Sequence, residues 1–491
     1  MGKKLLSLDA LLLFLLVLVR VRIDTLAIAV IPRPTELVAQ VPILGGLLSS
    51  QAQQLLTDWM ADPISSLLIA ATFGLTIIYL MLDIWENWPR GGTMKDRSGM
   101  QNAGDSAFDR QTASNVERSK SIPHSSFIIH ISTRRFYWAK LITLYLIIFL
   151  ITGVSTLLVV GLRHVTEPAR YAHDGGVLMT ESAMDFILAG KNPYVETYRG
   201  TPMEQAFPNG PGLSHYPYLP WTFLSSIPFY LAGKNTLGWY DQRFVYLLVF
   251  ALTLALVPKL AKTPRHKLAL VMLIGLNPIM GNDIVYGMND VFVAFWLILA
   301  AYLLQIDQPV LATASLGLAV ATKGTVWPIL PFYLMYVYRD ELVGFRAVRL
   351  SMLCRLLPLI IVPLVIVLPF AVWNFGAMVD DTWRYNMGSA VIDPLPIKGW
   401  GLANVILALG LVQDTMAPFP FWIFEALVAL PVLVVLLLRQ CRCNTLDNLL
   451  LSYGVFLLVF VFVSRTMNAN YLGFALTFVA AGFFAESAPR Q

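Results

Sequence analysis

Charged residues are scarce in this sequence. Of its 491 residues, 13% are Asp, Glu, Lys or Arg, about half of the roughly 25% that soluble domains carry. Hydrophobic residues make up 57% of the chain, which is too many for a disordered protein. The composition therefore excludes a soluble enzyme as well as a disordered chain. The basic residues lie in loops between apolar runs, so the net charge of +5 does not indicate a nucleic-acid partner.

Cysteine is rare as well. The three cysteines, Cys354, Cys441 and Cys443, lie beside apolar runs, and they do not form a disulfide framework. Cys441 and Cys443 have the spacing of a metal or redox pair, but no further Cys or nearby His completes such a site. No glycine-rich nucleotide motif and no His/Cys cluster is present in the sequence. We therefore expect no metal and no cofactor.

Long apolar runs are what the sequence does contain. A membrane-spanning helix needs about 20 consecutive apolar residues, and fewer suffice when it is buried among other helices. The fold class predicted is all-α, a polytopic membrane protein with about twelve transmembrane helices and additional re-entrant or interfacial helices. The predicted spans are residues 8–31, 63–82, 141–162, 244–258, 268–282, 291–305, 309–322, 324–338, 356–379, 426–438, 448–464 and 466–485.

The distribution of Lys and Arg predicts which loops face the cytoplasm. With the N-terminus inside, the inner segments hold 20 Lys and Arg and the outer segments hold 10, as the positive-inside rule requires. The basic loop 259–267 is the strongest indication, while the loop 163–218 is acidic and is predicted to lie outside. With 163–218 outside and 259–267 inside, the apolar stretch 219–233 cannot be a full crossing. The stretch 400–413 cannot be one either, because Arg439 and Arg442 should lie inside. Irregular backbone at membrane depth is tolerated only inside protein or beside a wet cavity, so both stretches indicate a cavity at the outer face.

The chain divides into three predicted regions. Residues 1–85 form an N-terminal accessory region with two spans. Residues 86–136 are polar and lack apolar periodicity, which is typical of a flexible linker, here on the cytoplasmic side. Residues 137–487 hold the remaining ten spans and the longest outer loop.

The outer loop begins with a candidate catalytic carboxylate. Asp174 follows the span 141–162 and precedes two glycines and an amphipathic helix over 177–189, on whose polar face lie Glu181 and Asp185. At the boundary between membrane and water, partial desolvation can raise the pKa of a carboxylate towards the range of a general base. The alternative is that Asp174 only caps the helix. We expect Glu181 and Asp185 to be largely solvated.

Three cations from distant parts of the sequence converge on the same membrane face. They are Lys323, between two apolar runs, Arg384, in the loop 380–398, and Arg465, between the last two spans. Arg suits a phosphate fork and Lys a point charge, so these residues are candidates for binding a phosphate. Lys323 could instead extend its ammonium group to the membrane surface.

Further candidates for substrate binding are polar and aromatic residues near the same face. His215 and Tyr216 begin an aromatic cluster that is either an interfacial belt or a ligand site. Asp290 opens a span on the outer side, and Asn470-Tyr471 follows Arg465. Ionisable groups inside a membrane are costly and usually functional.

The order of these motifs resembles the C-type integral-membrane glycosyltransferases, and among them the polyprenol-phosphate-mannose-dependent mannosyltransferases. The resemblance covers about residues 137–487. It is carried by Asp174, Gly190, Asn192, Pro193, Tyr194, Tyr216-Pro-Tyr-Leu-Pro220, Leu276-Asn-Pro278, Gly287-Met-Asn-Asp290, the Lys323 segment and Asn470-Tyr471.

The resemblance implies an inverting transfer from a polyprenyl-phosphate sugar, with Asp174 as general base. It also implies a role in substrate binding for Tyr194, His215, Tyr216, Asp290 and Tyr471. The sequence departs from metal-assisted members because position 174 lacks an Asp-x-Asp or Asp-Glu pair, so metal assistance is not expected.

The expected function is transfer of a mannose-like hexose or pentose to a lipid or glycan acceptor at the extracytoplasmic face of the cell membrane. The expected partners are the polyprenyl-phosphate donor, the acceptor and membrane lipids. One alternative is a multi-span transporter or flippase for lipid-linked or polar solutes, which would not need a long structured outer loop. Another is a polymerase or ligase of lipid-linked sugars, which would favour paired arginines in the later outer loop, where the sequence has only Arg384.

Overall fold

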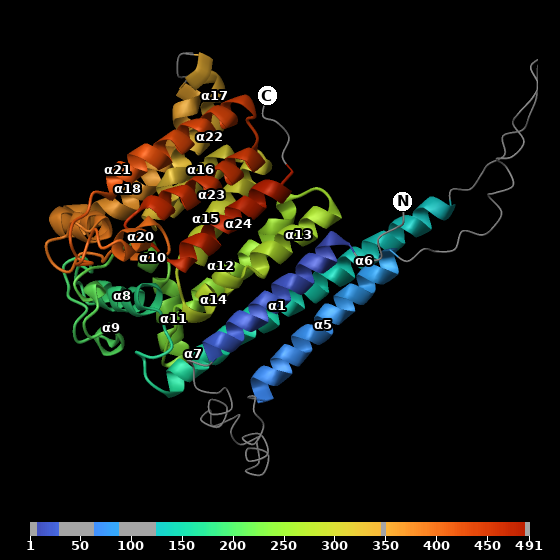
Figure 1. Ribbon diagram of the computed structural model, residues 1–491, viewed down its shortest axis with the longest axis horizontal. Coiled ribbons are helices and arrows are strands. Elements are labelled where there is room, and N and C mark those ends of the chain that lie inside the picture. The colour runs from blue at the N-terminus through green and yellow to red at the C-terminus, as the bar shows by residue number, and fades with distance from the viewer. Residues whose placement is uncertain (1–6, 29–62, 88–123, 345–349, 487–491) are drawn as a thin grey trace, which may run out of the picture.

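The computed structural model describes residues 7–28, 63–87, 124–344 and 350–486, and their regular secondary structure is almost entirely helical. Three long helices run alongside one another at one side of the molecule (Figure 1). They are α1 (Leu8–Ile28), α5 (Pro63–Asn87) and α6 (His124–Ile148), the last continuing through a π-helical segment η1 (Phe149–Val154) into α7 (Ser155–Val165).

The remaining helices form the main body. They are, in order, η2 (Asp174–Met179), α8 (Thr180–Leu188), α9 (Pro202–Ala206), η3 (Pro211–Leu213), α10 (Trp221–Leu224), α11 (Ile227–Leu237), α12 (Arg243–Leu256), η4 (Val257–Leu260), α13 (Pro264–Gly275), α14 (Pro278–Tyr286), α15 (Asp290–Gln305), α16 (Pro309–Val320), η5 (Gly324–Ile329), α17 (Leu330–Gly344), α18 (Leu350–Val379), η6 (Asp380–Arg384), α19 (Tyr385–Met387), α20 (Leu402–Ala408), α21 (Phe421–Phe424), η7 (Glu425–Ala429), α22 (Leu430–Arg442), α23 (Leu446–Val463) and α24 (Ala469–Phe484).

The helices confirm an all-α membrane protein. Within the described residues, five helices are long and apolar enough to cross a bilayer, or six if the bent pair α13 and α14 is one span. The pair is bent by 46° at Asn277-Pro278, where the proline cannot continue the α13 hydrogen-bond ladder. Three shorter apolar helices, α15, α16 and α24, accompany them. The count of twelve spans stays a prediction.

The two apolar stretches that were not assigned as crossings form short helices. In 219–233, the longer helix is α11, with 11 residues, which gives roughly 16 Å at 1.5 Å per residue. In 400–413, α20 has 7 residues. Neither reaches across a hydrocarbon core of about 30 Å.

The N-terminal region packs against the rest of the protein. Lys140 of α6 forms ion pairs of 2.5 Å with Asp83 and 2.6 Å with Glu86 of α5. Arg20 of α1 is buried and donates a 2.8 Å hydrogen bond to the carbonyl oxygen of Pro278, at the bend between α13 and α14. Of the predicted linker 86–136, residues 88–123 lie outside the described residues, and residues 124–136 belong to α6.

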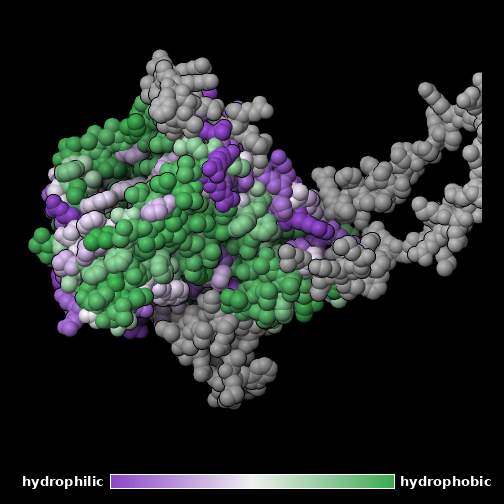
Figure 2. Space-filling model, turned by 45° about the horizontal axis from the view of Figure 1, so that its top comes forward, coloured by the Kyte–Doolittle hydropathy of each residue, from purple (hydrophilic) through white to green (hydrophobic). Residues whose placement is uncertain are grey.

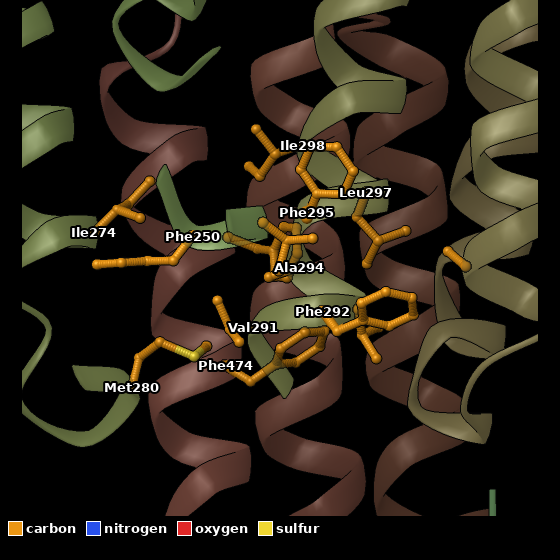
Figure 3. Close-up of a cluster of buried hydrophobic side chains, with 14 of the residues drawn as sticks. Phe250, Ile274, Met280, Val291, Phe292, Ala294, Phe295, Leu297, Ile298 and Phe474 are labelled. Carbon is orange, nitrogen blue, oxygen red and sulfur yellow. The ribbon is translucent and has the colours of Figure 1, made fainter. Parts of the chain in front are cut away.

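The buried centre lies where five helices of the main body meet. Side chains of α12, α13, α14, α15 and α24 point toward one another there, with Phe250, Ile274, Phe295 and Phe474 among them (Figure 3). The outer surface is apolar as well: Figure 2 shows broad hydrophobic areas over the helical body and hydrophilic residues mainly along its margins. An apolar interior inside an apolar flank is the arrangement of a protein embedded in lipid.

Candidate active site

Asp174 begins the π-helical segment η2, directly after an extended residue, His173. The backbone N–H of His173 donates a 2.8 Å hydrogen bond to the carbonyl oxygen of Tyr286, which fixes the start of η2 against the end of α14. The two glycines that follow are buried. A Cβ atom at Gly175 would collide with the Tyr218 hydroxyl, and one at Gly176 with the carbonyl oxygen of Gly287. The glycine pair therefore allows close packing beneath Asp174.

The Asp174 carboxylate faces a cavity and is 43% exposed. Its Oδ1 lies 2.8 Å from Nδ1 of His173 and accepts a 2.6 Å hydrogen bond from the Gly175 N–H. Burial would raise the pKa of Asp174, but His173, the Gly175 N–H and the charge of Lys398 outweigh it and hold the pKa below its usual range. The expected upward shift was therefore wrong, because hydrogen-bond donors and cations surround the carboxylate. Asp174 is ionised throughout the physiological pH range.

A second polar cluster lies across the same cavity. Nζ of Lys323 lies 2.8 Å from Oδ1 of Asp290 and 3.2 Å from Oδ1 of Asn289. The other carboxylate oxygen of Asp290 accepts a 2.6 Å hydrogen bond from Nδ2 of Asn470. Both oxygens of Asp290 are thus engaged by protein groups, and the residue fixes the position of Lys323.

Two tyrosine rings complete the surroundings of Lys323. Its ammonium group lies 5.6 Å from the ring centre of Tyr218 and 5.4 Å from that of Tyr471, within the range of a cation–π interaction. The Lys323 side chain is only 11% exposed. Lys323 therefore does not extend to the membrane surface, which removes that alternative.

The cavity between these groups has a volume of about 660 Å³, within the usual range for ligand sites. Part of its wall is polar and part is apolar. The polar part includes His173, Asp174, Asn289, Asp290, Lys323, Lys398, Glu425, Arg465 and Asn470. The apolar part includes Trp327, Phe419, Phe421, Trp422, Leu457, Phe460 and Val461. A ligand with a charged head and a hydrocarbon tail would match both.

The two predicted arginines are placed differently from each other. Arg465 lines the cavity, but its guanidinium donates hydrogen bonds of 2.6, 3.0 and 3.2 Å to the carbonyl oxygens of Leu395, Ala417 and Thr415. It therefore ties the loop between α19 and α21 to the end of α23. Arg384 is not among the residues that line the cavity. Its side chain is 55% exposed and lies 3.7 Å from Asp380.

Tyr194, His215 and Tyr216 were predicted to bind substrate, but none of them lines the cavity. All three are buried. His215 pairs through Nδ1 with Oδ1 of Asp381 at 2.7 Å, and the Tyr216 N–H donates a 2.8 Å bond to Oδ2 of the same carboxylate.

These buried residues support Tyr218, which does line the cavity. The Tyr194 hydroxyl donates a 2.8 Å hydrogen bond to the Tyr218 carbonyl oxygen, and the Tyr216 ring packs edge-on against the Tyr218 ring. The aromatic cluster is thus a scaffold behind the cavity wall. An Asp and a His that are far apart in the sequence gave no local signal of this pairing.

Lys398 was missed as a site residue. It lies in a two-residue strand β1 (Lys398–Gly399) that pairs in parallel with β2 (Thr466–Met467). This pairing brings Lys398 into the cavity wall, close enough to lower the pKa of Asp174. The sequence offers only a lysine in an outer loop as a signal, because the pairing joins segments 68 residues apart.

Glu181 was expected to be solvated, and that expectation was wrong. Its carboxylate forms bonds of 2.9 and 2.6 Å with the guanidinium of Arg163, and its side chain is 14% exposed. Arg163 also pairs with Asp241 at 2.8 Å. The partners come from α7 and the start of α12, so the polar helix face packs on protein. Asp185, one turn further on, is exposed as expected.

Comparison with known families supports the resemblance found from the sequence. Residues 184–339 match the model of the MptA_B family, described as alpha-(1->6)-mannopyranosyltransferase, N-terminal domain. The match supports a C-type membrane glycosyltransferase that transfers mannose. It includes α11 to α16 and the Asp290–Lys323 cluster, and begins ten residues after Asp174. No curated protein and no solved structure matches the chain significantly.

Proposed function

We propose that the protein transfers a mannose-like sugar from a polyprenyl-phosphate donor to a lipid or glycan acceptor, with inversion, at the extracytoplasmic face. The observation that carries the proposal is the amphiphilic cavity. Asp174 and two lysines lie at its polar part, and aromatic and aliphatic side chains of α21 and α23 line much of the rest, with Glu425 between these two helices. A sugar joined to a lipid through one phosphate likewise has a polar, charged end and an apolar end.

The donor phosphate would lie between Lys323 and Lys398. Both lysines line the cavity. They come from segments far apart in the sequence: Lys323 follows α16 and Lys398 lies in β1. Lys323 is held by Asp290, so its ammonium group is positioned before the donor arrives. Such preorganised charge is worth the most where negative charge develops on the leaving group. Arg465 would act here mainly by holding the loop that carries Lys398, and Arg384 is not part of the proposed site.

Asp174 would accept the proton of the acceptor hydroxyl. The hydroxyl oxygen forms a bond to the anomeric carbon as the bond from that carbon to the phosphate oxygen breaks, and polyprenyl phosphate leaves with the electron pair. Because the pKa of Asp174 is low, the carboxylate is a weak base for an unactivated hydroxyl. Proton transfer would therefore follow the start of bond formation, when the hydroxyl has become acidic.

The proposed reaction uses no metal. The three carboxylates that line the cavity are already engaged by protein groups. Asp290 pairs with Lys323 at 2.8 Å, Asp174 accepts a 2.6 Å hydrogen bond from the Gly175 N–H, and Glu425 accepts one of 2.9 Å from the Ser464 hydroxyl. A divalent ion at any of them would have to compete with such a partner.

The test is transfer of labelled mannose from polyprenyl-phosphate mannose by the purified full chain in liposomes, with and without EDTA. The expected result is a glycosylated acceptor with inverted anomeric configuration, formed at the same rate in EDTA. Movement of the intact labelled lipid across the bilayer without transfer would instead favour a flippase and reject the proposal.

A further inference from the structure

A second cavity lies on the other side of the helix that carries Asp174. Its volume is about 260 Å³. Met179 of the η2–α8 segment lines the first cavity, while Leu178, Glu181 and Asp185 of the same segment line the second. The segment is therefore a shared wall, and the proposed reaction makes no use of the second cavity.

The floor of the second cavity is a set of paired charges. Arg163 bonds the Glu181 carboxylate at 2.9 and 2.6 Å and the Asp241 carboxylate at 2.8 Å, and Asp241 also bonds Arg243 at 2.7 Å. Side chains that form ion pairs with one another in this way are held in place and need no further counter-ion. The floor is thus rigid and already neutralised.

The rim of the cavity presents aromatic rings and exposed polar groups. The His164 and Trp239 rings stack with their centres 4.1 Å apart and their planes at 19°. Asp185 is exposed, and one of its carboxylate oxygens accepts a hydrogen bond from the Tyr230 hydroxyl. The ammonium group of Lys234 lies 5.3 Å from the Tyr230 ring centre.

We infer that this cavity binds a sugar ring of a glycan acceptor, remote from the sugar that reacts. Aromatic rings offer flat apolar surface to the C–H groups of a sugar ring. A carboxylate accepts hydrogen bonds from sugar hydroxyls and an ammonium group donates to them. The cavity combines these groups on a rigid floor and has room for little more than one ring. The inference rests on the proposed function and names an acceptor class for it.

The position of the cavity sets the length of acceptor it can recognise. Asp174 and Asp185 are eleven residues apart along η2 and α8, which is roughly 16 Å at 1.5 Å per residue. A single sugar at Asp174 cannot also reach the second cavity, whereas a glycan of several sugars can. Occupation of the cavity would therefore favour extended acceptors.

The test compares His164→Ala with the wild-type full chain on two acceptors, one with a single mannose and one with several α-1,6-linked mannoses. Loss of a stacking ring should raise KM for the long acceptor about three- to tenfold and leave KM for the short one unchanged. Asp185→Asn should do the same, and His164→Phe, which keeps a ring, should restore KM. Arg199→Ala, an exposed cation outside both cavities, is the matched control.

Direct binding separates this inference from the proposed function. Soluble α-1,6-linked mannotriose should show saturation-transfer NMR signals with the wild type and weaker ones with His164→Ala, even if no sugar is transferred. Equal KM changes for both acceptors, no change for either, or displacement of mannotriose by inorganic phosphate would overturn the sugar site. Transfer without any chain-length effect would overturn it while leaving the proposed function intact.

Discussion

Asp174 and Glu181 are seven residues apart on one helical segment, but their carboxylates have different surroundings. Glu181 is closed off by Arg163, whereas Asp174 opens on the cavity with 43% of its side chain exposed. Access to the larger cavity therefore distinguishes Asp174 from Glu181 and Asp185, which line the second cavity instead. The low pKa that its neighbours impose also fixes its charge state.

We predict that Asp174→Asn reduces the initial transfer rate by about 10²–10⁴-fold with little effect on folding or donor binding, because Asn keeps the shape and loses the proton acceptor. Glu167→Gln is the matched control, since Glu167 is 58% exposed and pairs only with nearby Arg170. The rates are compared at equal protein level in liposomes. Retention of more than about a tenth of the wild-type rate, far above the loss expected for a general base, would reject the assignment.

Lys398 leads to a second prediction at this scale. Lys398→Ala and Lys323→Ala should each reduce kcat/KM for the donor about tenfold or more, because each removes a charge-assisted contact to phosphate. Lys191→Ala, an exposed lysine outside the cavity, should have no effect. Normal donor use by both lysine variants would contradict the phosphate site.

Arg465→Ala should lower thermal stability as well as activity, because three carbonyl groups lose their hydrogen-bond donor.

At the scale of elements, the site depends on the contact between η2 and the turn after α14. We predict that Gly176→Ala destabilises the protein by about 1–3 kcal/mol, a usual cost of overpacking, because the added methyl group meets the Gly287 backbone. Gly161→Ala is the control, since no atom lies within 4 Å of a Cβ there. Thermal unfolding in detergent measures both. Equal melting temperatures for the two variants would show that η2 can shift without cost.

The His215–Asp381 pair predicts a pH dependence of stability. Burial alone would lower the pKa of His215, but hydrogen bonds to Asp381 and to the carbonyl oxygen of Ile392 raise it above its usual value. A raised pKa in the folded state means that the charged imidazole stabilises the fold below its ordinary pKa of about 6.5 and that this contribution is lost as the pH rises through the raised value. The melting temperature should therefore fall above neutral pH. In His215→Gln this fall should be absent, and a fall of equal size there would assign it to other groups.

The apolar helices could be predicted because hydrophobic length is a local property of the sequence, and the stretches 219–233 and 400–413 could be distinguished from full crossings by the basic residues of the neighbouring loops. So could the placement of Lys323 and of Asp290 at one face, since each flanks a span, but not their ion pair or the position of Arg384 outside the cavity. The burial of Glu181, the scaffold role of His215 and the place of Lys398 could not. Glu181 is held by Arg163, 18 residues before it, and by the Gln242 N–H, 61 residues after it. The partner of His215 is 166 residues away and that of Lys398 is 68 residues away. Such partners are fixed only by the packing of the whole chain.

For the whole molecule, sidedness is the property that decides whether the cavity can receive a lipid-linked donor from outside. We predict that in a cysteine-free background Asn209→Cys is labelled by an impermeant thiol reagent added to intact cells and Arg265→Cys is not. Both positions are exposed, so the reagent can reach a cysteine at either of them. Ser182 in α8, which belongs to the same loop as Asn209, is buried, so a cysteine there would not report the side on which the loop lies. Permeabilised cells should label both variants. Labelling of Arg265→Cys alone would place the cavity on the cytoplasmic side.

The contact of Arg20 with the bend between α13 and α14 has a consequence for biosynthesis. The hydrogen bond joins residues 258 positions apart, and at about 5–20 residues per second the ribosome needs roughly ten to fifty seconds to make the intervening chain. During that interval α1 has been made while its carbonyl acceptor does not yet exist. Helix α1 therefore cannot take its final position as soon as it is made. It has to dock late, after α13 and α14 have been inserted into the membrane.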